Sequence, residues 1–241
     1  MTRTEPSMKL SVIIPVFNEA ATLRECVDAV LNIASENLRL DVLIIDDGST
    51  DESRNIAAEL AAKHDCIKLT VQPGNQGKGA AVRLGFDLVT GDFVAIQDAD
   101  LEYSPVDLLR LIEPIKRDDA DVVFGSRFHG RSLRNMSWRQ AIHCLGNRSL
   151  TWLSNRMTRL ALTDMETCYK VFRREVLADL KLDENRFAIE PQLASEIARL
   201  RLRVVELPIS YQGRGYGEGK KIGLRDAWRA GYCILFRSSR R

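Results

Sequence analysis

The chain has 241 residues, of which 45% are hydrophobic and 28% charged, so it is long enough to bury the core of one large domain. Its 35 Lys and Arg residues against 33 Asp and Glu leave a formal net charge of +2, which argues against a nucleic-acid partner. The five cysteines form no Cys-x-x-Cys pair, the N-terminus does not read as a signal peptide, and no apolar run is long enough to span a bilayer. We therefore expect a cytoplasmic protein that is soluble or peripheral to a membrane.

Apolar strands alternate with amphipathic helices through the first half of the chain. The expected strands are Leu10–Pro15, Asp41–Asp47, Cys66–Val71, Phe93–Ile96 and Asp121–Gly125, and helices are expected to end near Ala34, Lys63, Val89 and Arg117. Units of about 25–30 residues in this order are typical of a parallel sheet covered by helices on both faces. Ligands of such sheets bind beyond the carboxyl ends of the strands.

The second half breaks this rhythm. Residues 128–163 contain several arginines and no acidic residue, which predicts a basic, mostly helical stretch. A strand at Tyr169–Phe172, a helix ending near Leu200 and a strand at Val204–Tyr211 should follow. We expect a lead at 1–8, one domain at 9–212 with a nucleotide-binding half (9–127) and an acceptor half (128–212), and a basic amphipathic tail at 213–241.

Two carboxylates, Asp98 and Asp100, directly follow the buried strand Phe93–Ile96. At the end of a strand they should point to the same side, and two anions this close repel each other unless a cation lies between them. A hard divalent ion such as Mg²⁺ or Mn²⁺, held together with substrate phosphates, fits this arrangement. The alternative is a plain acidic turn; the position at the end of a strand, with Ser104-Pro105 opening a helix, favours the metal site.

Two further motifs follow strand ends. The glycine-rich turn Gly74–Gly79 lacks the spacing of a P-loop or of a dinucleotide fingerprint. A helix N-terminus with Lys78 close by suits a diphosphate, but a plain turn is an equal interpretation. Of the two acids that end the second strand, Asp47 is the preferred nucleotide ligand over Asp46, which could instead cap the turn.

The order of these motifs carries more information than any one of them. The chain resembles the family 2 glycosyltransferases of the GT-A fold, and within them the dolichyl- or polyprenyl-phosphate mannose (or glucose) synthases. The motifs are Pro15–Glu19, Asp46–Ser49, Gly74–Gly79, Asp98–Glu102, Gly125–Phe128, Asp164–Lys170, and Gly213-Arg214 with Glu218–Lys221. This resemblance implies an α/β, Rossmann-like mixed sheet, mainly parallel, with helices on both faces.

The resemblance also assigns site residues. It implies an inverting transfer of a hexose from a GDP- or UDP-linked sugar, with Mg²⁺ or Mn²⁺ as cofactor. The implied nucleotide-binding residues are Pro15, Val16, Glu19, Asp47, Lys78, Asp98 and Ala99. The implied metal ligands are Asp98, Asp100 and Glu102, the last standing where many relatives have Gln, and the implied catalytic residues are Asp98, Asp100 and Arg127.

The chemistry of the acceptor favours a lipid phosphate. A phosphate monoester is nucleophilic at neutral pH, because its second pKa is about 6, so it needs cationic docking rather than a base. The residues that could supply this docking are Arg127, Arg131, Arg214, Lys220 and Lys221. We therefore expect a polyprenyl-phosphate acceptor at the inner face of the membrane, reached through the basic tail or through a membrane-anchored partner.

Two alternatives remain open. An enzyme that acts on a soluble hydroxyl acceptor would need a general base, for which Asp164, Glu166 and Glu190 are candidates; a structural role, holding arginines in place, is slightly favoured for these acids. A non-catalytic subunit that binds a nucleotide sugar and recruits a membrane partner is the other alternative, and the intact Asp98–Asp100 pair argues against it.

Overall fold

A computed structural model describes residues 8–128, 138–213 and 224–237. Its centre is one seven-stranded sheet in the order β3-β2-β1-β4-β6-β5-β7. The strands are β1 (Met8–Val16), β2 (Leu38–Asp46), β3 (Ile67–Val71), β4 (Phe93–Ile96), β5 (Val122–Ser126), β6 (Lys170–Arg173) and β7 (Val204–Pro208). Neighbouring strands are parallel except for β6, which runs antiparallel to both β4 and β5.

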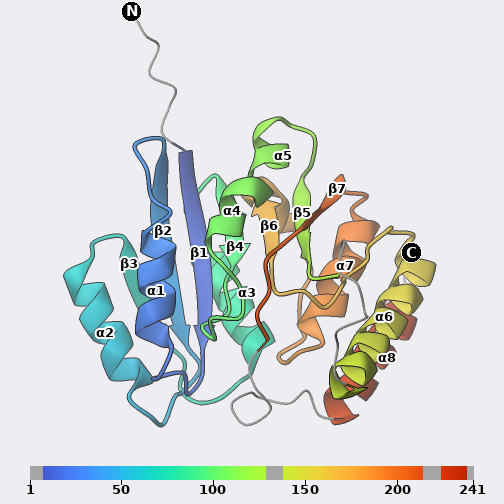
Figure 1. Cartoon of the computed structure of the whole chain (residues 1–241), viewed down its shortest axis with the longest axis horizontal. Helices are drawn as coiled ribbons and strands as arrows, with labels where there is room; N and C mark the ends of the chain where they lie inside the picture. Colours follow the sequence, from blue (N-terminus) through green and yellow to red (C-terminus); the bar gives the residue numbers. More distant parts are fainter. Residues whose placement is uncertain (1–7, 129–137, 214–223, 238–241) are drawn as a thin grey trace, which may run out of the picture.

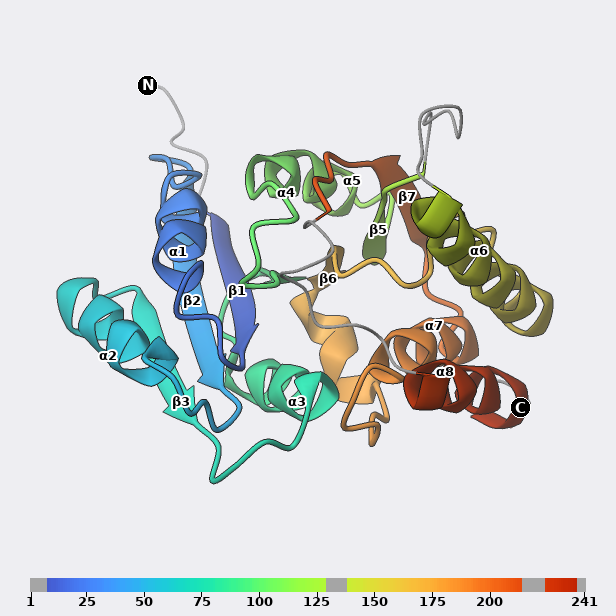
Figure 2. The same ribbon diagram turned by 60° about the horizontal axis from the view of Figure 1, so that its bottom comes forward.

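Helices cover both faces of the sheet, so a mixed but mainly parallel α/β fold is confirmed. Figure 2 shows α1, α2, α4 and α5 on one face and α3 and α7 on the other. The helices are α1 (Leu23–Leu31), α2 (Ser53–Lys63), α3 (Lys78–Leu88), α4 (Val106–Leu111), α5 (Glu113–Lys116), α6 (Trp138–Thr158), α7 (Ile189–Arg199) and α8 (Leu224–Arg237), with a 3₁₀ helix η2 (Arg174–Asp179). At one end of the sheet α6, α7 and α8 pack against one another (Figure 1).

The strand sequences explain this arrangement. Central strands covered on both faces need apolar residues in succession rather than in alternation, and β4 is buried at every position, as is nearly all of β2. The parallel strands β1, β2 and β4 end side by side, with Val16 opposite Asp46 and Ile13 opposite Ile96. The loops that follow these strands therefore meet at one edge, the lower edge of the sheet in Figure 1.

The second half differs from a simple repeat of the first. After β5 the chain passes through α6 and returns as β6, which inserts between β4 and β5. The single helix expected up to Arg117 is divided into α4 and α5, with Pro114 in the first turn of α5; proline is well tolerated there because that position needs no N–H donor. Within the described ranges, no helix combines the length and apolar character that a bilayer crossing requires.

Gly85 is required by the close packing of α3 on β1. A Cβ atom at this position would lie 2.5 Å from Cγ2 of the buried Ile13, whereas a Cβ atom at Gly146 of α6 would meet nothing within 4 Å. We predict that Gly85→Ala lowers the free energy of unfolding by about 1–3 kcal/mol, because overpacking forces side chains and backbone to shift.

Gly146→Ala is the matched control. It should leave stability unchanged or raise it by about 0.5–1 kcal/mol, because alanine is the better helix former. Urea unfolding measures both variants. Equal effects would show that the contact between α3 and β1 is looser than described.

Candidate active site

An acidic edge lies directly after β4. Asp98 and Asp100 are both partly exposed, and the Cys26 thiol of α1 donates a hydrogen bond to the Asp98 carbonyl at 3.5 Å. Burial, followed by the negative charges of Asp100, Asp98 and Glu19, raises the pKa of Cys26 to about 12. The loops after β1 and β4 therefore bring these carboxylates close enough to act on the thiol electrostatically.

A chain of alternating charges crosses the site from α3 to β6. Nζ of Lys78 lies 2.8 Å from Oδ1 of Asp98 and 3.3 Å from Oε1 of Glu190. The other oxygen of Glu190 lies 2.5 Å from Nζ of Lys170, which also donates to the Thr167 carbonyl. The order is carboxylate, ammonium, carboxylate, ammonium, and each buried charge has an opposite partner, as burial requires.

Lys78 stays charged within this chain. Burial alone would lower its pKa, but the negative charges of Asp98 and Glu190 outweigh burial and hold the pKa well above its ordinary value. The first helical residue of α3 thus places a permanent cation against Asp98, and the Lys78 side chain is only 16% exposed. The acidic edge thus binds a positive charge at Asp98, where the Lys78 ammonium lies.

Asp47 shapes the glycine-rich loop. Its two carboxylate oxygens accept hydrogen bonds from the backbone N–H groups of Gln76 and Gly77, both at 2.7 Å, and from the Gln72 side chain at 3.1 Å. The neighbouring Asp46 instead pairs with Arg54 at 3.1 Å. Asp47 therefore fixes the entry into α3, and the N–H groups that it binds are already occupied in the described structure.

The glycines of this loop have a packing reason. A Cβ atom at Gly77 would lie 2.4 Å from the carbonyl oxygen of Asn185, and one at Gly79 would lie 2.3 Å from that of Glu184. Gly77 also has a φ of +102°, which strains any other residue. The loop is therefore glycine-rich because the backbone before α7 lies directly against it. Neither a plain turn nor a phosphate-binding turn predicts this contact.

Glu102 is held by the segment that follows β7. Its Oε2 accepts a hydrogen bond from the Tyr211 hydroxyl at 2.8 Å, and its carbonyl accepts one from the Gln212 N–H at 2.9 Å. The Glu102 N–H donates to Oδ1 of Asp100 at 3.2 Å, across a turn in which Leu101 has a φ of +61°. The acidic motif is therefore tied to the C-terminal half of the chain through Tyr211.

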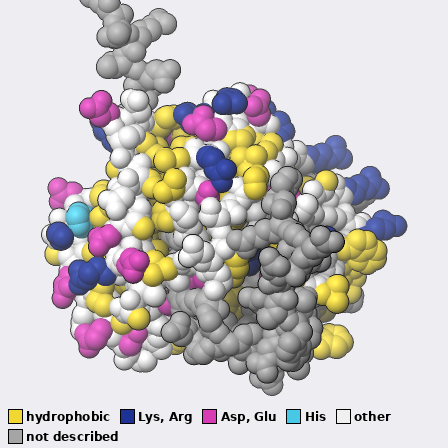
Figure 3. Space-filling model, viewed as in Figure 1, with side chains coloured by type: hydrophobic (Ala, Val, Ile, Leu, Met, Phe, Trp, Pro, Cys, Tyr) yellow, Lys and Arg dark blue, Asp and Glu magenta, His cyan; other side chains and the backbone are white. Residues whose placement is uncertain are grey.

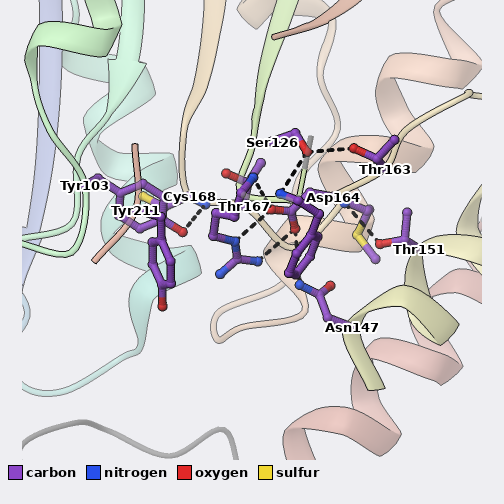
Figure 4. A network of polar contacts seen from close by, with 12 residues as sticks. Tyr103, Ser126, Asn147, Thr151, Thr163, Asp164, Thr167, Cys168 and Tyr211 are labelled. Carbon is purple, nitrogen blue, oxygen red and sulfur yellow. Dashed lines mark hydrogen bonds and ion pairs between the residues drawn. The ribbon is translucent and has the colours of Figure 1, made fainter. Parts of the chain in front are cut away.

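Arg127, directly after β5, forms a close ion pair with Asp164. Figure 4 shows Asp164 in this network, with Asn147 of α6 close by. Nε and Nη2 of Arg127 donate to the two oxygens of Asp164 at 2.7 and 2.8 Å, and the Arg127 N–H adds a third bond at 3.0 Å. Asn147 of α6 donates to the same carboxylate at 3.2 Å. The guanidinium also lies 5.3 Å from the centre of the Tyr211 ring. Asp164 therefore holds an arginine in place, and Nη1 has no hydrogen-bond partner among the described residues.

Glu166 differs from Asp164 and Glu190, the other two candidate bases. Its Oε1 is buried and accepts no hydrogen bond from the described part of the chain. Burial, followed by the charge of Glu190, raises its pKa to about 7, while Lys170 and Arg127 oppose that shift. Of the three candidate bases, Glu166 is the one whose carboxylate keeps an oxygen without a partner in the part of the chain that the structure describes.

The acidic edge suits a hard divalent ion. Asp98 and Asp100 offer carboxylate oxygens, the ligand type that Mg²⁺ and Mn²⁺ prefer, and the Lys78 ammonium already occupies the place of a cation beside Asp98. Across the described ranges, no three acidic, His or Cys residues converge as a ready-made metal site. Oε2 of Glu102 accepts the hydrogen bond from Tyr211, and its role as a metal ligand stays a prediction. Two carboxylates are enough when the diphosphate of a substrate supplies further oxygens.

The structure places the remaining predicted residues as follows. Pro15 and Glu19 lie partly exposed at the same edge, whereas the side chains of Val16 and Ala99 are buried in the core, so that only their backbone atoms could face a nucleotide. Four predicted acceptor residues, Arg131, Arg214, Lys220 and Lys221, lie outside the described residues.

Several residues of the site could not be identified from the sequence alone. Lys170 and Tyr211 each lie far along the chain from the partner that they contact. For Glu190 the sequence predicts either a base or, slightly favoured, a carboxylate that holds arginines in place, whereas in the structure it bridges two lysines. A lysine inside an otherwise apolar strand, as in Tyr169–Phe172, was the available hint, because a buried charge needs a partner.

The fold has close counterparts among solved structures. Glucosyl-3-phosphoglycerate synthase from Mycobacterium tuberculosis in complex with uridine-diphosphate superposes with a TM-score of 0.73 at 18% identity, covering 96% of this chain and 80% of that one. Its complex with Mn²⁺, uridine-diphosphate and glucosyl-3-phosphoglycerate gives 0.72 at 19% identity, with the same coverage. The architecture is therefore that of GT-A glycosyltransferases.

Residues 11–181 match the model of glycosyl transferase family 2, and the chain belongs to that family. The low-salt glycan biosynthesis hexosyltransferase Agl6 of Haloferax volcanii is 29% identical over 221 residues, which cover 91% of this chain and 51% of that protein. The chain thus spans about half the length of this relative.

Glu166 should give the stability of the fold a pH dependence. Because its folded pKa is raised to about 7, the folded state holds a proton that the unfolded state releases at lower pH. The stabilising contribution is therefore present below about pH 4 and is lost as pH rises through about 7. We predict that the free energy of unfolding of Glu166→Gln, minus that of the unchanged chain, increases by about 1–3 kcal/mol as pH rises from 5 to 8.

Urea unfolding at several pH values measures this difference, in which contributions common to both proteins cancel. Glu36→Gln, an exposed change of the same kind, should run parallel to the unchanged chain. A Glu166→Gln curve that also runs parallel would contradict the assignment.

Proposed function

We propose that this chain is an inverting hexosyltransferase that moves a hexose from a nucleoside-diphosphate sugar, linked to GDP or UDP, to a polyprenyl phosphate at the cytoplasmic face of a membrane. The observation that carries the proposal is the acidic edge after β4, where Asp98 pairs with the Lys78 cation and Asp100 follows two residues later, at the carboxyl ends of the parallel strands. Family membership and the fold support the transfer of a glycosyl group.

The donor is expected to lie over the ends of β1, β2 and β4. Pro15, Glu19 and the loop fixed by Asp47 surround this edge. Asp98 and Asp100 would hold Mg²⁺ or Mn²⁺, which when bound neutralises the charge of a departing diphosphate. Lys78 supplies a fixed positive charge within reach of the same phosphates. The Mycobacterium tuberculosis synthase of the same fold, solved with Mn²⁺ and uridine-diphosphate, supports a donor and cofactor of this kind.

The acceptor is expected at Arg127. Asp164 and Asn147 fix the position of the guanidinium. The two N–H groups of Nη1 donate no hydrogen bond to any described residue. Pre-positioned guanidinium groups bind phosphate oxygens strongly. A phosphate docked here attacks the sugar carbon as a dianion, so the site needs no group to remove a proton.

Asp100→Asn tests the donor side. We predict that it lowers turnover by about 100-fold or more, because the departing charge loses part of its stabilisation. It should also abolish the Mn²⁺-dependent part of the thermal stabilisation that a GDP- or UDP-sugar confers. A panel of both donors with Mn²⁺ or Mg²⁺ identifies the base and the metal.

Asp65→Asn, an exposed substitution in the turn after α2, is the matched control and should behave as the unchanged chain. Undiminished turnover by the Asp100→Asn variant would refute the proposal. Nucleotide binding without turnover on any acceptor would favour a non-catalytic subunit.

Glu166 supports a second candidate, transfer to a soluble hydroxyl acceptor. A hydroxyl must lose its proton during attack, and a carboxylate with a pKa of about 7 and one oxygen that no described residue contacts by a hydrogen bond suits a general base. The glucosyl-3-phosphoglycerate synthase of the same fold is solved with phosphoglyceric acid, a small soluble molecule.

The two candidates differ in their dependence on pH. If the acceptor is a hydroxyl, kcat/KM should rise with pH to a plateau above about pH 7, and Glu166→Gln should lower the plateau about 100-fold and remove the rising limb. With a polyprenyl phosphate as acceptor, Glu166→Gln should change kcat/KM little. A loss with the phosphate acceptor as large as with the hydroxyl would contradict both roles.

A further inference from the structure

Helices α6 and α8 carry most of the hydrophobic side chains that the described structure exposes. Of its nine exposed large hydrophobic side chains, five lie on these two helices: Leu145, Trp152, Trp228, Tyr232 and Leu235. Trp152 is 68% exposed and Trp228 is 81% exposed. Because α6 and α8 pack against each other, these side chains belong to one end of the molecule, which we call the α6–α8 surface. Isolated exposed apolar residues need no explanation, but a concentration of large ones marks an interaction site.

Spacing along each helix separates this surface from the core. On α8, Trp228, Tyr232 and Leu235 follow one another at the helical interval, while Ala230, Cys233 and Ile234 between them are buried. On α6, Leu145, Trp152 and the arginines Arg148 and Arg156 are exposed, while Thr151 and Ser154 are buried. Helix α6 therefore buries small polar residues, and α8 buries apolar residues. Both helices nevertheless present large aromatic rings to the outside.

The charge of this surface indicates what covers it. The sequence from Phe128 to Thr163 contains no acidic residue, and Arg148, Arg156 and Arg159 are all exposed. On α8, Arg229 pairs with Glu184. Figure 3 shows Lys and Arg side chains next to hydrophobic ones along the edge where Figure 1 places α6. Tryptophan and tyrosine together with arginine are characteristic of helices that lie in the interface of an anionic bilayer.

The surface is also connected to the candidate active site. Helix α7, which begins with Ile189 and Glu190, packs against both α6 and α8. Asn147 of α6 contacts Asp164, the partner of Arg127. A bilayer in contact with α6 and α8 would thus lie beside the proposed acceptor position.

We propose that the α6–α8 surface docks on an anionic phospholipid bilayer, with Trp152 and Trp228 inserted at the level of the headgroups and Arg148 and Arg156 contacting lipid phosphates. This inference deepens the proposed function, because it states how a water-exposed site would reach a lipid acceptor. It concerns residues outside the donor site, and its test requires no turnover.

The experiment is co-sedimentation of the full chain with vesicles of phosphatidylcholine containing 30% phosphatidylglycerol. The Trp152→Ala/Trp228→Ala double variant should bind about tenfold more weakly, because it removes most of the exposed aromatic area. Val106→Ala/Leu88→Ala, which removes exposed apolar side chains from α4 and α3, is the matched control and should bind as the unchanged chain.

Two further measurements separate the contributions. Arg148→Gln/Arg156→Gln should weaken binding about 25-fold, since each basic residue near an anionic surface contributes about a factor of five; Lys116→Gln/Arg117→Gln, both exposed at the end of α5, should have little effect. Brominated lipids should quench the tryptophan fluorescence of the unchanged chain more strongly than that of the Trp152→Ala/Trp228→Ala variant.

Several results would overturn the inference. The first is vesicle binding that the α6–α8 variants leave intact, and the second is absence of vesicle binding by the unchanged chain. The third is a dimer of the unchanged chain in sedimentation velocity, with no vesicle binding, that the Trp152→Ala/Trp228→Ala substitutions dissociate. Turnover with a short, water-soluble polyprenyl phosphate should survive in the Trp152→Ala/Trp228→Ala variant. A failure of the proposed function would instead appear as no turnover in the unchanged chain, whatever its vesicle binding.

Discussion

The ion pair between Lys78 and Asp98 is the constraint on which the site depends. A carboxylate after β4 and an ammonium at the start of α3 can meet only if the glycine loop before α3 is drawn close to the sheet edge. Asp47 draws that loop in by binding its backbone N–H groups, and the absence of side chains at Gly77 and Gly79 lets the loop lie against the backbone before α7. The geometry of the acidic edge is thus set by loops from both halves of the chain.

This constraint also explains why buried charges occur so close together. Burying the Glu190 carboxylate alone would be unfavourable in free energy, but Lys78 and Lys170 lie on either side of it. A change at any member leaves a neighbour uncompensated, so these residues form a unit rather than a set of independent contacts. Among the described residues, Oε1 of Glu166 shares none of the hydrogen bonds of this unit, and burial together with the charge of Glu190 raises the pKa of Glu166.

Much of the fold could be predicted from the sequence because its information is local. Runs such as Phe93–Ile96 identify buried strands, and the alternation with helices identifies a mainly parallel sheet. The direction and position of β6 could not be predicted in this way, because no pattern within Lys170–Arg173 states which strands will be its neighbours. The acidic pair after β4 was recognisable from its position, whereas the contact of Glu102 with Tyr211 and the two-sided pairing of Glu190 depend on long-range packing.

The position of β6 has a consequence for how such a chain can change. This antiparallel strand is hydrogen-bonded to β4 on one side and to β5 on the other, and the residues just before it include Asp164 and Glu166. The strand that leads to the acidic edge and the strand that leads to Arg127 therefore share one neighbour. A chimaera that exchanges the N-terminal half between relatives at residue 127 would join a foreign β4 to the resident β6. Recombination between family members is thus best tolerated where the exchanged segment carries β4, β5 and β6 together.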